Sequence, residues 1–129
     1  TRWHSPNVAK YAVAIARDLG MSPSQLEEMH IAAILHDVGK IGISELIISK
    51  PDRLSREEFD IMKDHPAHGM RILEPIGFSP AISNAIYQHH ERFDGKGYPQ
   101  GIGGKDISLA ARILSVADTI DAMISERPP

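Results

Sequence analysis

Seven histidine and aspartate side chains in this sequence are of the types that bind metal ions. They fall in five short segments, which are His4, His36-Asp37, His65, His89-His90 and Asp118. Imidazole nitrogens and carboxylate oxygens suit iron, manganese or zinc, and a carboxylate can bridge two ions. The chain contains no cysteine, which excludes thiolate ligands and disulfides. The residue types therefore predict a centre for divalent metals.

Two of these segments are adjacent pairs, His36-Asp37 and His89-His90. Neighbouring residues on a helix point about 100° apart, so both members of a pair reach one cluster only where a helix ends. Both pairs lie a few residues before glycines, as such an end requires. A lone histidine is more often a surface or packed residue than a ligand, and we interpret His30 and His68 in that way. The two pairs together favour a shared metal cluster.

The elements that must position these side chains are all predicted to be α-helices. Ser5-Pro6 opens the first helix, which stops at Gly20, and a capping box at residues 22–25 opens the second, which ends near His36-Asp37. Further helices are predicted over residues 43–48, from a capping box at 55–58 to a break at Pro66, and over 67–73, 79–90 and 109–124. The glycine-rich segment 94–105 is predicted to be a loop. Because no alternating strand pattern occurs, the predicted fold class is all-α.

The chain has 129 residues, enough for one domain with a hydrophobic core, and 42% of them are hydrophobic. It has only one Trp, three Tyr and three Phe, so the core must consist mainly of aliphatic side chains. The predicted buried positions include Leu26, Met29, Ala33 and Ile34 in the second helix, and Phe59 and Met62 in the helix after residue 55.

The net charge of −3 argues against binding of polymeric nucleic acid, which usually requires a surplus of basic residues. A small phosphate-bearing ligand is compatible with it, because local cations or metals can bind such a ligand. The longest apolar stretch, residues 31–35, is too short to cross a bilayer, and no signal peptide is recognised. We therefore expect a cytoplasmic domain that does not itself insert into a membrane, although its parent protein could be membrane-anchored.

Several motifs in the sequence resemble the HD-GYP family, a branch of the HD superfamily of metal-dependent phosphohydrolases. The resemblance runs from Thr1 and His4-Ser5 to Arg127-Pro128. Between these ends it rests on residues 35–42 (LHDVGKIG), Lys50-Pro51, His65-Pro66, residues 89–92 (HHER), residues 94–99 (DGKGYP), Ala111-Arg112-Ile113, Ala117-Asp118 and Asp121-Ala122. HD alone is a weak signal, but its combination with the HHERxDGxGYP pattern at this separation is highly specific.

The resemblance implies a helical bundle of the HD-domain type that hydrolyses cyclic di-GMP to linear pGpG or GMP with two divalent ions, iron or manganese. It implies that one ion is held by His4, His36, Asp37 and Asp118, and that Asp37 bridges to a second ion on His65, His89 and His90. It further implies that Lys40 binds the scissile phosphate and that the loop from Gly95 through Gly97 and Tyr98 to Pro99 lines the mouth of the site. Arg92 is expected to face the ligand or to brace this loop.

Two carboxylates near these motifs have alternative interpretations. Asp121 lies three residues after Asp118, and we expect it to orient a ligand or to pair with an arginine such as Arg112 rather than to bind metal. Glu91 is either a helix-end carboxylate or a group that supports a ligand. In the family, the loop is also implicated in contacts with other signalling domains.

Phe93 stands where the family often has tryptophan, which keeps an aromatic side chain. Family domains usually continue for several helices beyond the Arg127-Pro128 segment, so we expect residues 1–129 to be one catalytic core excised from a longer signalling protein, shortened at its C-terminal end. A supporting glutamate of some members would fall just before Thr1, so a third metal stays open.

Three other functions were weighed against the leading one. A phosphohydrolase acting on another nucleotide is the nearest alternative, because no residue in these motifs recognises guanine directly. A binding module without turnover would normally have lost metal ligands, and none of the seven is replaced. A purely structural bundle gives no reason for the two pairs beside glycines.

Overall fold

The structure is a computed structural model that describes residues 4–125. Its helices are α1 (His4–Asp18), α2 (Pro23–Leu35), α3 (Glu45–Ile48), α4 (Arg56–Met62), α5 (His65–Leu73), α6 (Pro80–Gln88) and α7 (Leu109–Ile124). Short 3-10 helices follow at η1 (Val38–Gly42), η2 (Glu74–Ile76) and η3 (Gly104–Asp106). Residues 4–125 contain no strand, which confirms the all-α prediction. Thr1 and Arg127-Pro128, which carry the ends of the resemblance, lie outside the described residues.

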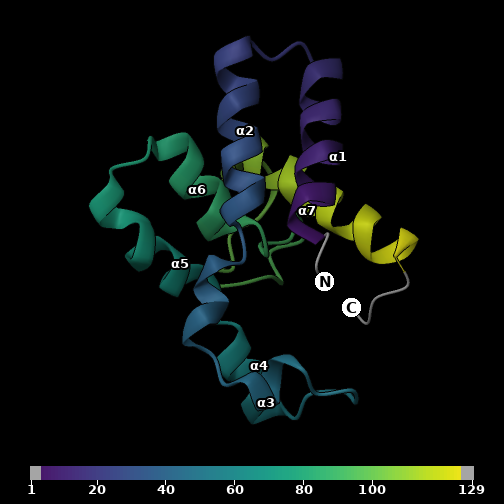
Figure 1. The fold of residues 1–129 in the computed structure, drawn as a ribbon, viewed down its shortest axis with the longest axis vertical. Helices are drawn as coiled ribbons and strands as arrows, with labels where there is room; N and C mark the ends of the chain where they lie inside the picture. Colours follow the sequence, from purple (N-terminus) through teal and green to yellow (C-terminus); the bar gives the residue numbers. More distant parts are fainter. Residues whose placement is uncertain (1–3, 126–129) are drawn as a thin grey trace.

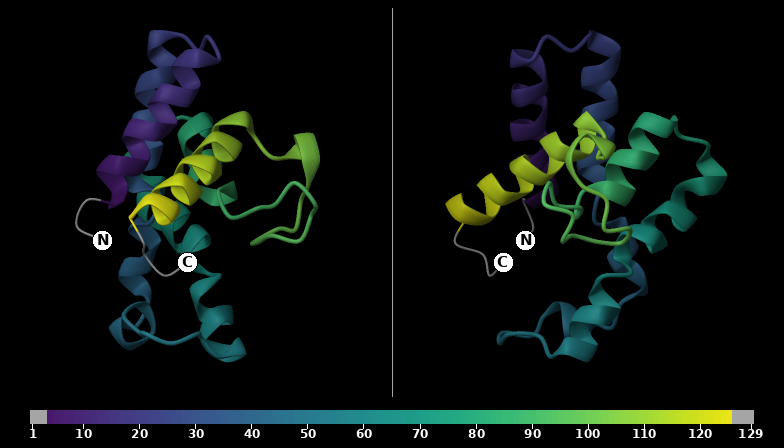
Figure 2. Two further views of the ribbon diagram at one scale, coloured as in Figure 1. Left: turned by 90° about the vertical axis from the view of Figure 1, so that its right-hand side faces the viewer. Right: turned by 180° about the vertical axis from the view of Figure 1, so that it is seen from behind.

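Helices α1 and α2 form an antiparallel pair, and α7 packs across one end of it, as Figure 1 shows. Helix α6 packs against α2 and α7, and α5 packs against α6 and η1. Helices α3 and α4 form an arm that extends away from the α1–α2 pair, and the loop between α6 and α7 projects to one side (Figure 2). No helix within residues 4–125 has the length and apolar character needed to span a bilayer.

The helix boundaries follow local capping chemistry. Both predicted capping boxes are present: Ser22 accepts a hydrogen bond from the Gln25 backbone N–H, and the box at residues 55–58 has the same reciprocal pattern. Helix α5 begins at His65 rather than at residue 67. Pro66 is therefore in the first turn, where a missing N–H removes no helical hydrogen bond. Helix α6 ends at Gln88, two residues earlier than predicted, and this frees the following two histidines from the helix.

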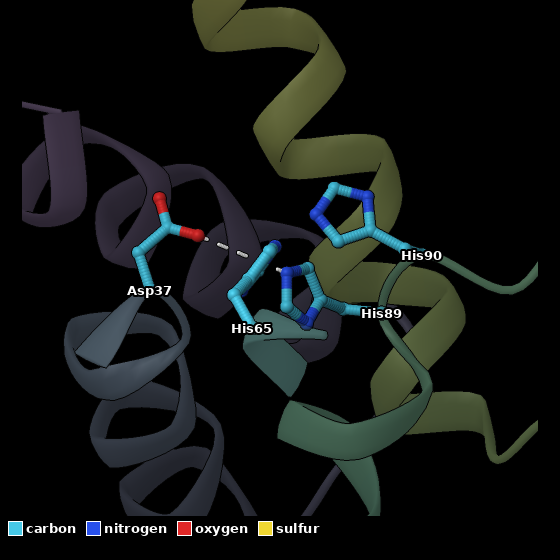
Figure 3. A group of neighbouring side chains, drawn as sticks. All are labelled: Asp37, His65, His89 and His90. Carbon is cyan, nitrogen blue, oxygen red and sulfur yellow. Dashed lines mark ion pairs between the residues drawn. The ribbon is translucent and has the colours of Figure 1, made fainter. Parts of the chain in front are cut away.

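Three of these boundaries meet at one place. Asp37 lies between α2 and η1, His65 is the first residue of α5, and His89 and His90 directly follow α6. Figure 3 shows these four side chains gathered between the ends of their elements. The fold therefore brings the two predicted ligand pairs together at helix ends.

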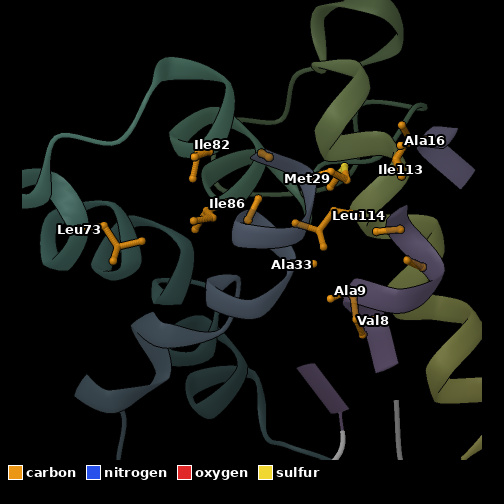
Figure 4. Packing of buried hydrophobic residues seen from close by; sticks show 14 residues of the cluster. Val8, Ala9, Ala16, Met29, Ala33, Leu73, Ile82, Ile86, Ile113 and Leu114 are labelled. Carbon is orange, nitrogen blue, oxygen red and sulfur yellow. The ribbon is translucent and has the colours of Figure 1, made fainter. Parts of the chain in front are cut away.

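The hydrophobic core lies between α1, α2, α6 and α7 (Figure 4). Alanines on facing sides of α1 and α2, such as Ala12 and Ala33, let these helices approach closely, and Met29 and Leu114 fill the space beside them. Met29 and Ala33 are buried as predicted. The burial of two other side chains was predicted wrongly: Ile34 is 39% exposed and Phe59 is 44% exposed. In the case of Phe59 the reason is that α4 belongs to the arm and contains no buried residue.

Candidate metal centre

Two groups of potential metal ligands share a single carboxylate. Asp37 belongs to one group with His65, His89 and His90 and to another with His4 and His36, and within each group the ligand atoms lie within 4.8 Å of one another. Asp118 adjoins the second group, since its Oδ1 is 3.0 Å from Nε2 of His4 and 3.8 Å from Nε2 of His36. All seven residues of the predicted set therefore meet at one centre.

Hydrogen bonds from the outer ring nitrogens to backbone carbonyl groups orient two of the histidines. Nδ1 of His36 donates to the Ala33 carbonyl oxygen and Nδ1 of His89 donates to the Ile86 carbonyl oxygen, each at 2.6 Å. Both acceptors lie in the last turn of their helices, α2 and α6, where backbone carbonyl groups lack a partner within the helix. The inner Nε2 atoms of these rings are buried and face the carboxylate of Asp37, at 3.3 Å for His36 and 3.9 Å for His89. A neutral imidazole tethered through Nδ1 presents its Nε2 lone pair to a cation, so these two inward-facing atoms fit a metal site.

His4 is tethered by a carboxylate instead. Its Nδ1 lies 2.7 Å from Oδ2 of Asp121, which is 1% exposed. This contact places Asp121 behind a predicted ligand and agrees with the orienting role that we expected of it.

Without a metal, the histidine pKa values shift in opposite directions in the two halves of the centre. The carboxylates of Asp118 and Asp37 raise the pKa of His4 to about 9. Burial by itself would lower the pKa of His36, but the same two carboxylates outweigh it and raise the pKa to about 10. These two imidazoles are therefore protonated at neutral pH. Their positive charge balances the carboxylates of Asp37 and Asp118, as a bound metal cation would do.

In the other half, burial is the main cause of the shifts. It lowers the pKa of His65 to about 3 and that of His89 to about 4, and the positive charge of a neighbouring imidazole (His89 for His65, His36 for His89) contributes to each shift. Burial, followed by the neighbouring His89, also holds the pKa of His90 well below its usual range. These three rings are neutral over the physiological range, which is the form that binds metal.

Lys40 lies beside the shared carboxylate. Its Nζ is 3.3 Å from Oδ2 of Asp37, and its side chain is 36% exposed. Burial would raise the pKa of Asp37, but His36 and His4, with Lys40, hold it well below the usual range. A partly exposed cation thus stands at the edge of the centre.

A pocket of about 410 Å³ opens next to the His89-His90 pair. Besides these histidines it is lined by Phe59, Lys63, Glu91, Arg92, Lys96, Gly97, Tyr98 and Ser115. Its volume falls within the usual range for small-molecule sites, about 300–1,000 Å³. Three of its lining side chains are basic, so it is suited to an anionic ligand.

The loop at this pocket is held by a buried carboxylate. Glu91, which is 4% exposed, accepts hydrogen bonds from the backbone N–H groups of Gln100 at 2.7 Å and Gly101 at 2.9 Å. The ring of Tyr98 stacks on His90, with centroids 4.9 Å apart and planes at 15°. Glu91 therefore supports the loop rather than a metal-binding histidine directly.

Only some of the substrate-binding residues predicted in the loop line this pocket. Arg92, Gly97 and Tyr98 line the pocket, whereas Gly95 and Pro99 do not. Arg92 is exposed and its Nη2 lies 2.7 Å from Oδ2 of Asp94, which matches the loop-bracing alternative.

Three of the lining residues, Phe59, Lys63 and Ser115, lie outside the motifs. Ser115 has a usable signal, because it precedes Asp118 by three residues on α7 and so lies on nearly the same helix face. Phe59 and Lys63 lie in the arm, and nothing in their local pattern connects them to a loop more than thirty residues away.

Comparisons with known proteins agree with this geometry. A family model described as HD domain matches residues 2–129. The chain is 44% identical over 131 residues to a cyclic di-GMP phosphodiesterase of Thermotoga maritima, and 40% identical over 128 residues to 3'3'-cGAMP-specific phosphodiesterase 3 of Vibrio cholerae. Each alignment covers 99% of this chain but only 35% and 28% of these relatives. Among solved structures, an HDG"Y"P protein from Bdellovibrio bacteriovorus has a TM-score of 0.81 at 29% identity, over 94% of this chain and 40% of that one.

An all-α fold that gathers histidines and aspartates at its helix ends, together with the family match, places this chain in the HD-domain family. Within that family it is of the HD-GYP type, and residues 94–99 (DGKGYP) form part of the loop beside the histidine pair.

Proposed function

We propose that this chain is the catalytic core of a metal-dependent phosphodiesterase that opens a cyclic dinucleotide, with cyclic di-GMP as its substrate and linear pGpG or GMP as its product. The observation that carries the proposal is the shared carboxylate of Asp37, which belongs to two ligand groups beside a pocket with basic walls. The names of the Thermotoga maritima and Vibrio cholerae relatives support the reaction class.

The proposed cofactors are two divalent ions, iron or manganese. His4, His36, Asp37 and Asp118 would hold one, and Asp37, His65, His89 and His90 would hold the other. When bound, such a pair supplies Lewis-acid charge to a phosphodiester and lowers the pKa of water by several units. The chain itself contributes the spacing, because the tethered imidazoles and the shared carboxylate have little freedom to move apart.

Lys40 is proposed to stabilise the phosphate undergoing attack. Its ammonium group lies 3.3 Å from the carboxylate of Asp37, so a phosphate at the shared edge of the centre would lie within its reach. Asp37 and Lys40 are the two residues to which we assign a catalytic role.

The wider pocket is proposed to bind the rest of the substrate. Arg92, Gly97 and Tyr98 line it, and the segment from Gly95 to Pro99 shapes its mouth. Its basic side chains would attract a ligand with two negative charges.

The projecting loop is also the surface that we propose for contact with other signalling domains of a longer protein, which would act in the cytoplasm. No role in binding polymeric nucleic acid is proposed.

A second substrate is favoured by one observation. The chain is 40% identical to a protein named as specific for 3'3'-cGAMP, which differs from cyclic di-GMP in one base. Both substrates should therefore be offered in the same assay, and the preferred one is that with the higher kcat/KM.

The test is to purify the chain, load it with Mn²⁺ or Fe²⁺, quantify bound metal and follow conversion of each cyclic dinucleotide to linear product. Asp37→Ala should lose both bound metal and turnover, because it removes a ligand common to both groups. Asp52→Ala, which removes an exposed carboxylate in a turn far along the chain, is the matched control and should retain both. Full activity in Asp37→Ala, or a metal-loaded wild type that opens neither substrate, would refute the proposal.

A further inference from the structure

Helix α4 has no evident role in the stability of the core. It contains no buried residue, and it lies in the arm that extends away from the α1–α2 pair (Figure 1). Two of its large apolar side chains, Phe59 and Ile61, are 44% and 46% exposed. Exposed apolar side chains occur singly on most surfaces, so exposure alone assigns no function. The surroundings of Phe59 and Ile61 differ, however.

Phe59 lines the pocket beside the metal centre, whereas Ile61 does not. The ring of Phe59 meets the ring of Tyr98 edge to face, with centroids 5.9 Å apart and planes at 82°. Tyr98 in turn stacks on His90. A continuous series of rings thus runs from a predicted metal ligand to helix α4 of the arm, and its outer member is half exposed.

A cation accompanies this outer ring. Nζ of Lys63 lies 5.7 Å from the centroid of Phe59, and Lys63 also lines the pocket. Its ion pair with Asp60 is long, 3.5 Å, and the two side chains are 39% and 60% exposed, so the pair is weak and does not commit the ammonium group to Asp60.

A half-exposed aromatic ring with a cation over it combines the two groups that bind nucleobases and phosphates without reading the base edges. We propose that Phe59 and Lys63 form a base-and-phosphate subsite on α4, which holds the half of a cyclic dinucleotide that is not being cleaved. This inference rests on the proposed function. In this arrangement one phosphate lies at the metal centre, a purine of the distal half stacks on Phe59, and Lys63 pairs with the second phosphate.

The subsite explains why the arm carries an aromatic residue that it does not bury. Stacking is tolerant of base identity, so the subsite would serve guanine and adenine alike. It selects for a substrate with a second nucleotide, and a mononucleotide diester would gain nothing from it.

The test compares Phe59→Leu, which keeps an apolar side chain but removes the ring, with Phe59→Trp, which keeps a stacking surface. For cyclic di-GMP, Phe59→Leu should raise KM about 5- to 150-fold, which corresponds to about 1–3 kcal/mol of stacking, with little change in kcat or bound metal. Phe59→Trp should stay within about threefold of wild type by the same stacking range. Lys63→Met should raise KM about 2- to 5-fold, the range for an exposed ion pair.

Ile61→Ala is the matched control, because it removes an equally exposed apolar side chain from the same helix outside the pocket. It should leave KM unchanged. A KM for Phe59→Leu equal to that of wild type would overturn the subsite. A drop in kcat and bound metal together with an unchanged KM would also overturn it, because it would mark Phe59 as a structural support of the loop.

Equilibrium binding of cyclic di-GMP after chelation of metal separates this inference from the proposed function. The affinity of Phe59→Leu should again be weaker than that of wild type. If this difference is present but metal-loaded wild type shows no turnover, the proposed function fails and the subsite stands. Equal affinities, or a chelated wild type that binds no cyclic di-GMP, would overturn the subsite alone, because the proposed function is decided by turnover of the metal-loaded protein.

Discussion

Gly39 lies at a close backbone contact between η1 and α5, so Gly39→Ala tests the geometry of the whole centre. A Cβ atom on Gly39 would overlap the carbonyl oxygen of His65 and lie 2.6 Å from the backbone nitrogen of Gly69. Both obstacles are backbone atoms, which cannot rotate away as a flexible side chain would. The substitution must therefore push α5 away from η1.

The expected cost follows from this forced movement. Overpacking of a close contact typically costs about 1–3 kcal/mol, which lowers the melting temperature by roughly 4 °C per kcal/mol in a domain of this size. Because α5 begins with His65 and η1 follows Asp37, the displacement also separates two members of one ligand group. We expect Gly39→Ala to retain less of the metal assigned to His65, His89 and His90.

Gly69→Ala is a matched control on the opposite side of the same contact. Its Cβ atom would meet a side-chain carbon of Ile86 at 3.4 Å and the backbone nitrogen of Gly39 at 3.5 Å, which are ordinary contacts. Gly69 is in the interior of α5, where alanine is favoured over glycine by about 0.5–1 kcal/mol. This variant should therefore be as stable as wild type or more stable.

The assay is thermal unfolding of the chelated proteins, followed by metal analysis after reloading. We expect Gly39→Ala to lower the melting temperature and Gly69→Ala to leave it unchanged or raise it. If Gly39→Ala melts with wild-type stability and rebinds metal at the wild-type ratio, the close contact of η1 and α5 is wrong, and the grouping of Asp37 with His65 fails with it.

Three further perturbations test separate parts of the structure. Asp121→Asn keeps the shape of the group that tethers His4 but removes its charge, and it should weaken metal retention about 10- to 100-fold in a chelator competition. Lys50 lowers the pKa of Glu58 to about 2. This carboxylate therefore stabilises the fold above pH about 4.5 and loses that contribution as the pH falls toward 2. The difference in melting temperature between wild type and Glu58→Gln should shrink between pH 5 and pH 3. Glu91→Gln replaces the charged acceptor of two loop amides. At about 1.5–3 kcal/mol per lost hydrogen bond, the hydrogens of these amides should exchange with solvent about 10- to 100-fold faster. Unchanged exchange would show that other contacts hold the loop.

The sequence alone determined those features that depend on local chemistry. Capping boxes at Ser22 and Ser55 fix helix starts through hydrogen bonds that span only three residues. The helical pattern of residues 109–124 predicted the bounds of the 16-residue helix α7 correctly. The candidate ligand set was also accessible, because residue type limits which side chains can bind metal and the motif spacing is specific. All seven side chains lie at the centre.

Only the tertiary structure decided what surrounds those ligands. Phe59 was predicted to be buried because its apolar character is visible in the sequence, whereas its place on an arm helix with no buried residue is not. The pairing of Glu91 with loop amides ten residues away, and of Asp121 with His4 across most of the chain, depends on how the helices pack. Residue type limits what a side chain can bind, but the partner that it meets is set by contacts between elements distant in sequence, and no local pattern encodes those contacts.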